Sequence, residues 1–61
     1  MRPAYDFGRE LAEEPRFEDR DWSDIEPEAR RMFEQQQPGK WDTYGTAVHR
    51  GFTEARQHAH A

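Results

Sequence analysis

The sequence predicts an all-α fold, a small three-helix bundle that contains an internal repeat of about 19 residues. Three observations lead to this expectation. Apolar residues recur at helical spacing, proline and glycine divide the chain into three segments, and the second and third segments match when the chain is shifted by 19 residues.

Helix-breaking residues give the boundaries of the expected helices. Pro15 closes the first segment and Pro38-Gly39 closes the second, because proline cannot continue a helix and glycine ends one at little cost. We expect helices over residues 4–13, 24–36 and 42–56.

The start of the second helix is open between Ser23 and Glu26. Ser23-x-x-Glu26 has the pattern of a capping box, in which two side chains bind the free N–H groups of the first turn. Pro27 favours a later start, since proline suits the first helical position and the residue before it resists helical geometry.

The helical spacing of apolar residues predicts one core. In the first segment Tyr5, Gly8 and Ala12 share a face with Leu11 beside it, whereas Phe7 points elsewhere. The residues expected to be buried are Leu11, Phe17, Trp22, Ile25, Ala29, Phe33, Trp41, Tyr44, Val48 and Phe52.

Two groups of residues in these helices have alternative interpretations. Trp22 and Trp41 lie on apolar stripes, which favours the core over exposed platforms that stack on nucleic-acid bases. Gly8, Gly45 and Gly51 each cost about 1 kcal/mol in a helix relative to alanine. Gly8 and Gly51 fall on the apolar side, where we therefore expect close approach of a neighbouring helix or a bulky ring, with local flexibility as the alternative.

The internal repeat rests on identities at one offset. Trp22 aligns with Trp41, Phe33 with Phe52, and Arg31 with Arg50, with further apolar matches of Ile25 to Tyr44 and Ala29 to Val48. If these segments are copies, both tryptophans begin their helices and both arginines face solvent.

Composition limits the function classes. The 61 residues allow one domain, expected over residues 1–57 with a flexible tail at 58–61. The 13 acidic against 9 basic residues give a net charge of −4, which argues against a dedicated nucleic-acid-binding module. The absence of cysteine excludes disulfides and thiolate metal sites.

No stretch has the roughly 20 apolar residues of a membrane helix, so a soluble, cytoplasmic protein without membrane contact is expected.

The sequence predicts no catalytic residues, no metal site and no cofactor, and hence no enzyme. Adjacent carboxylates such as Glu13-Glu14 match solvated faces better than a catalytic cleft. His49, His58 and His60 suggest weak metal binding, but a frayed terminus explains the last two more simply.

Arg31 and Arg50 are the candidate partner contacts. Both face away from their apolar stripes, and as a matched pair they can bind an acidic partner or a phosphate. Local pairing, of Arg31 with Glu34 and of Arg50 with Glu54, is the alternative.

Several motifs resemble a group of small bacterial proteins associated with the general stress response. The chain carries Pro3-Ala4-Tyr5-x-x-Gly8-x-x-Leu11-Ala12, then Arg20-x-Trp22-x-x-Ile25-Glu26-Pro27-Glu28 with Arg30-Arg31, then Pro38-Gly39-x-Trp41, Ala47-Val48 and Gly51-Phe52. The resemblance covers residues 3 to 56, and Asp6-Phe7 departs from the basic residue and tyrosine common in the group. It implies a bacterial helical domain with a link to stress and no assigned chemistry.

These expectations combine into a non-enzymatic helical domain, an interaction or structural accessory in bacterial stress tolerance. Its partner is expected to be an unknown protein or a second copy of the chain. The alternative is a nucleic-acid-associated protein that uses its outward arginines.

Overall fold

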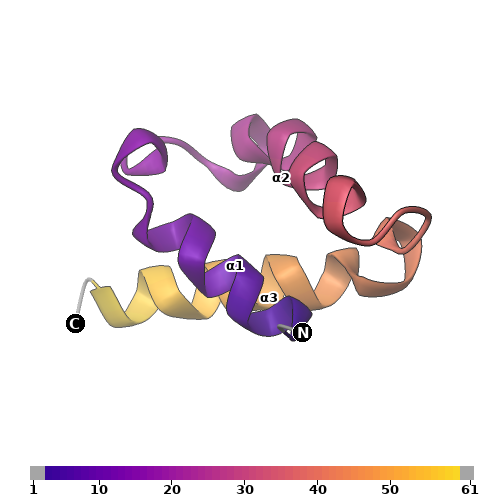
Figure 1. The fold of residues 1–61 in the computed structure, drawn as a ribbon. Helices are drawn as coiled ribbons and strands as arrows, with labels where there is room; N and C mark the ends of the chain where they lie inside the picture. Colours follow the sequence, from indigo (N-terminus) through magenta and orange to yellow (C-terminus); the bar gives the residue numbers. More distant parts are fainter. Residues whose placement is uncertain (1–2, 60–61) are drawn as a thin grey trace.

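The computed structural model describes residues 3–59 and shows an all-α fold. This part of the chain has no strand and contains α1 (Ala4–Glu13), a short 3-10 turn η1 (Pro15–Phe17), α2 (Trp22–Gln36) and α3 (Trp41–Ala59). In Figure 1, α1 and α3 run in the same direction and cross, and α2 runs back in the opposite direction. The predicted three-helix fold is confirmed.

Proline and glycine end the helices where the sequence predicts. Glu14, which precedes Pro15, is extended (φ −70°, ψ 125°) and stops α1. Gly39 follows α2 with φ 76°, a conformation that glycine adopts without steric cost. The Gly39 N–H donates to the Glu34 carboxylate at 2.5 Å, which secures the turn into α3.

The start of α2 differs from the prediction. The helix begins at Trp22, before the expected window, and the Asp21 carbonyl accepts the Ile25 N–H at 3.2 Å. The predicted capping box is not formed, and Pro27 lies inside the helix, where it removes one backbone hydrogen bond. The Trp22 ring packs on Phe52, with ring centroids 5.2 Å apart, and this tertiary contact favours the earlier start.

The end of α3 also differs. The helix continues through Ala59, so residues 58 and 59 of the predicted tail are helical, whereas 60 and 61 lie outside the described residues. None of the helices within residues 3–59 has an apolar stretch long enough to cross a membrane.

Two glycines let α1 and α3 touch through their backbones. A Cβ at Gly8 would overlap the Val48 carbonyl and lie 2.9 Å from the Phe52 nitrogen. A Cβ at Gly51 would overlap the Tyr5 carbonyl. The expected close approach of a neighbouring helix is therefore confirmed at Gly8 and Gly51. Small residues continue each stripe one turn to either side, at Ala4 and Ala12 on α1 and at Ala47 and Ala55 on α3.

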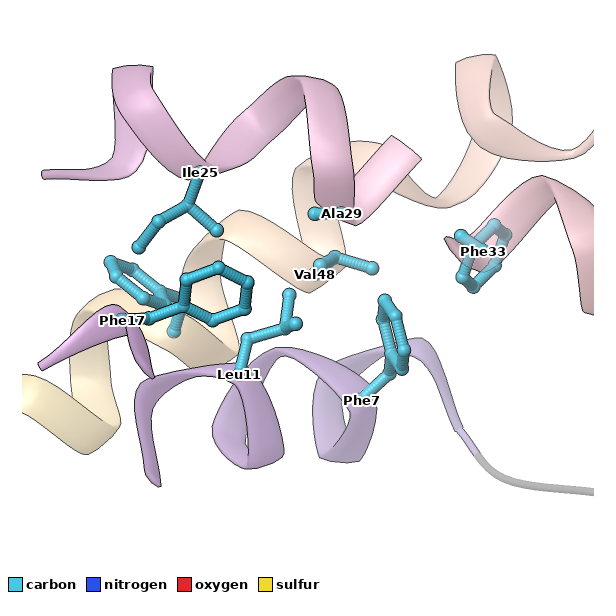
Figure 2. Close-up of a cluster of buried hydrophobic side chains, with 8 residues drawn as sticks. Phe7, Leu11, Phe17, Ile25, Ala29, Phe33 and Val48 are labelled. Atoms are coloured by element: carbon cyan, nitrogen blue, oxygen red, sulfur yellow. The ribbon is translucent and has the colours of Figure 1, made fainter. Parts of the chain in front are cut away.

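The core is one cluster of apolar side chains contributed by all three helices and η1 (Figure 2). Seven predicted core residues are buried, and Trp22 and Trp41 are half-buried against them. The buried residues are Phe7, Leu11, Phe17, Ile25, Ala29, Phe33, Val48 and Phe52.

Two core expectations were wrong. Phe7 is 8% exposed because α1 has two neighbours: its small-residue face meets α3, while Phe7 turns to α2 and its ring centroid lies 5.7 Å from that of Phe33. Tyr44 is 41% exposed, since it lies in the first turn of α3, with Phe33 as its ring neighbour at 6.2 Å.

The internal repeat stays a prediction. Trp22 and Trp41 are each the first residue of a helix and are both half-buried, and Phe33 and Phe52 are each 3% exposed. The match fails at the next pair, because Ile25 is fully buried and its counterpart Tyr44 is exposed. Two amphipathic helices that pack on one core produce the same agreement without duplication.

Arg56 holds η1 against α3. Its guanidinium donates to the Phe17 carbonyl and lies 4.5 Å from the centroid of the Phe52 ring. The side chain therefore ties together two core residues that are 35 positions apart in the sequence. No local sequence pattern indicates this role, because an arginine at the end of a helix is ordinarily solvated.

Replacing Arg56 with alanine is expected to lower the free energy of unfolding by about 1–3 kcal/mol, since it removes a charge-assisted hydrogen bond and a cation–π contact. Urea unfolding measures the change. Arg50→Ala is the control, because its exposed ion pair contributes less than about 1 kcal/mol. Equal losses in the two variants would contradict the role given to Arg56.

Candidate functional site

The predicted contact residues Arg31 and Arg50 are both exposed, on α2 and α3 respectively. Arg50 pairs with Glu54, with Nε and Oε2 3.0 Å apart, as local pairing predicts. The alternative partner of Arg31 is engaged elsewhere, since the Glu34 carboxylate accepts the Gly39 N–H. A joint role of the two arginines in contacting a partner stays a prediction.

Arg50 belongs to a small network that joins α3 to α1. The Tyr5 hydroxyl donates to Glu54 at 2.7 Å, and Arg50 donates to the other carboxylate oxygen. The hydrogen bond from Tyr5, followed by that from Arg50, lowers the pKa of Glu54 below its ordinary value of 4.5. The same carboxylate raises the pKa of Tyr5 above 10.0, because the phenol loses a hydrogen bond when it ionises.

This network predicts a pH dependence of stability. Since the pKa of Glu54 is lowered on folding, its contribution is present above the unfolded-state pKa and is lost as the pH falls through the folded-state value. The contribution of Tyr5 to stability has the opposite pH dependence. It is present below pH 10.0 and is lost as the pH rises through the raised folded-state pKa of Tyr5.

Melting temperatures of the wild type and of Glu54→Gln test the acidic limb. The wild type is expected to melt higher at about pH 7, and the difference is expected to shrink as the pH falls through the lowered folded-state pKa of Glu54. A difference that is the same at both pH values would show that Glu54 acts without its charge.

The histidines have separate surroundings. His49 stacks on Trp22, with ring centroids 4.6 Å apart and planes 3° apart, whereas His58 lies beside a groove between α1 and α3 lined also by Tyr5 and Arg9. Within the described part of the chain, no group of three or more histidines and carboxylates converges as a metal site would require. His60, the third predicted histidine, lies outside it.

The most distinctive surface feature is a run of near-parallel rings where α2 meets α3. The Trp22 ring stacks on His49, and its centroid lies 6.4 Å from that of Trp41, with planes 16° apart. Both indoles are half-buried, so they are part of the surface as well as of the packing. The two interpretations of these tryptophans, core and platform, therefore each describe part of their environment.

Local sequence explains how α3 presents these rings. Trp41, Gly45 and His49 recur every four residues and share one face of the helix. A Cβ at Gly45 would lie 3.1 Å from the Trp41 indole, so glycine lets that ring lie along the helix. Trp22, the first residue of α2, packs against the Trp41 and His49 rings on this face.

Beside these rings lies a shallow pocket of about 270 Å³, which we call the indole pocket. Its lining is aromatic and acidic and contains no lysine or arginine. The seven lining residues are Trp22, Glu26, Trp41, Asp42, Gly45, Thr46 and His49.

The two carboxylates of the indole pocket come from different helices. Glu26 belongs to the second turn of α2 and Asp42 to the first turn of α3, and both are exposed. Within residues 3–59 neither has an ion pair or a hydrogen-bonding side chain as partner. The pocket therefore offers two carboxylates next to two indoles, an arrangement that attracts cations.

The sequence held part of the signal for this pocket. The spacing of Trp41, Gly45 and His49 is visible in the sequence, but the sequence suggests His49 as a metal ligand and Glu26 as part of a helix cap. Asp42 and Thr46 drew no attention, because nothing in the linear sequence places them beside Trp22.

Comparison with known proteins found no matching family model, no matching curated protein and no matching solved structure. The resemblance to bacterial stress-associated proteins is therefore carried only by the sequence motifs given above.

Proposed function

We propose that this chain is a non-enzymatic helical domain that binds a protein partner, with the indole pocket as part of the contact surface. The observation that carries the proposal is the position of both tryptophans of the chain, side by side and half-buried at one surface site. Tryptophan is enriched among the residues that dominate binding energy in protein interfaces, because a rigid ring buries much area at little entropic cost.

The size of the domain is compatible with this role. Its accessible surface is 4530 Å², and a standard interface covers roughly 800 Å² on each partner, which is less than a fifth of this surface. From the resemblance, we further propose that the partner belongs to the bacterial stress response, with self-association as the other form of the proposal.

The nucleic-acid alternative has weaker support. A binding site for single strands combines stacking rings with a positively charged groove. Here the rings lie beside Glu26 and Asp42, which repel phosphate, and Arg50 is engaged by Glu54. We therefore favour a protein partner.

Tryptophan fluorescence tests the proposal directly, because both tryptophans line the pocket. The wild type is titrated with three capped, unstructured peptides, one basic, one acidic and one apolar, and with a single-stranded oligonucleotide. We expect at least one peptide to give a saturable change with a dissociation constant below about 1 mM.

A blocking variant locates the binding. Thr46→Arg fills the indole pocket, whereas Gln35→Arg adds the same charge at an exposed position on the far side of α2 from Glu26. Binding is expected to be lost in the first variant and kept in the second. The proposal is wrong if no peptide binds, if only the oligonucleotide binds, or if Thr46→Arg binds as the wild type does.

A further inference from the structure

We infer that the indole pocket recognises the guanidinium group of an arginine side chain, presented by an exposed basic segment of the protein partner. This inference rests on the proposed function and adds the chemistry of the recognised group.

The Trp22 and Trp41 rings are the aromatic part of the indole pocket. Carbon atoms in full face-to-face contact lie about 3.5–4.0 Å apart, so centroids 6.4 Å apart leave the Trp22 and Trp41 rings only partly covered by one another. The face of an indole carries negative charge and attracts a cation more strongly than the other aromatic side chains do. His49 covers part of the Trp22 ring, so the aromatic area left for a cation is mainly the part of the Trp41 ring that Trp22 does not cover.

The Glu26 and Asp42 carboxylates are the charged part of the indole pocket. Glu26 and Asp42 lack partners among the described side chains, and they approach the pocket from two helices. Because no lysine or arginine lines the pocket, a cation that enters it meets no like charge from those side chains. The net charge of −4 adds a favourable long-range field for a basic segment.

The shape of the site favours arginine over lysine. A guanidinium is planar, weakly hydrated and stacks on aromatic faces while its N–H groups bind carboxylates as a fork. An ammonium is a compact, strongly hydrated charge without a stacking face. The volume of about 270 Å³ lies just below the usual range for small-molecule sites, which suits the head of one side chain.

Three matched peptides test the assignment. Each is a capped chain of glycine and serine that carries two arginines, two lysines or two citrullines at the same positions. Citrulline keeps the planar shape and loses the charge. By tryptophan fluorescence at about pH 8 and low salt, we expect the arginine peptide to bind several-fold more tightly than the lysine peptide and about tenfold more tightly than the citrulline peptide.

A charge-matched pair of variants tests the carboxylates. Glu26→Gln combined with Asp42→Asn is expected to weaken binding of the arginine peptide about tenfold. Glu18→Gln combined with Asp19→Asn removes the same charge from an exposed loop and is expected to bind as the wild type does. All four positions are exposed, and circular dichroism verifies that each variant is folded.

Each outcome separates the inference from the proposed function. Equal binding of the arginine and lysine peptides, or of the arginine and citrulline peptides, overturns the guanidinium assignment and leaves a protein-binding pocket. Equal weakening in both double variants shows that only net charge matters and also overturns it. If none of these peptides and none of the previous panel binds, the proposed function fails as well.

Discussion

Replacing Phe33 with alanine is expected to lower the free energy of unfolding by about 3–5 kcal/mol, close to the whole stability of so small a domain. Phe33 is 3% exposed, and its ring joins all three helices. The ring centroids of Phe7 on α1 and Trp41 on α3 lie 5.7 and 5.8 Å away. Removing the ring therefore leaves a cavity at the point where the helices meet.

Thermal and urea unfolding measure this effect. Phe52→Ala is expected to behave alike, because Phe52 is equally buried and supports Trp22 and Arg56. Tyr44→Ala is the matched control, an aromatic residue that is 41% exposed, and its cost is expected to be well below that of Phe33→Ala. A Phe33→Ala variant that melts within a few degrees of the wild type would contradict the core described here.

Replacing Gly8 or Gly51 with alanine is expected to destabilise the domain by about 1–3 kcal/mol, even though alanine favours helices over glycine by about 1 kcal/mol. The added Cβ meets backbone atoms of the facing helix, which cannot rotate away as a side chain can. Helices α1 and α3 must then separate, and the packing between them is lost.

The control is Thr53→Ala at an exposed position of α3, which is expected to be neutral or slightly stabilising. Urea unfolding of the three variants gives the comparison. Stabilisation by Gly8→Ala or Gly51→Ala would mean that the helices do not approach as closely as the structure places them.

The helices were largely predictable because their stop signals are local. Pro15 and Gly39 act through their own backbone geometry, which needs no knowledge of the fold. The start of α2 was less predictable, because it depends on a contact between Trp22 and Phe52, a residue 30 positions away in the sequence.

The two faces of α1 show a limit of periodicity. A single apolar stripe was assigned to the side of Gly8, which left Phe7 pointing outward. In the structure two neighbouring faces of α1 pack on two different helices. Gly8 and the small residues of its face contact α3, whereas Phe7 contacts Phe33 of α2. Hydrophobic spacing identifies a buried face but does not count the elements that cover it.

The candidate site was less predictable than the fold. Glu26 and Asp42 are 16 residues apart and belong to different helices, so only the packing of α2 on α3 brings them to one pocket. Arg31 and Arg50, which the repeat suggests as a pair, are both exposed but belong to different helices, α2 and α3.

The most direct test of the indole pocket as a contact surface is a map of amide and indole N–H resonances during titration with the arginine peptide. The chain has two tryptophans, so each indole N–H gives one resolved signal. We predict that both indole signals and the amides of Glu26, Asp42 and Thr46 shift together and saturate, while those of Gly8 and Gly51 stay unchanged. Shifts that centre on Arg31 or Arg50 instead, or the absence of any saturable shift, would contradict the account.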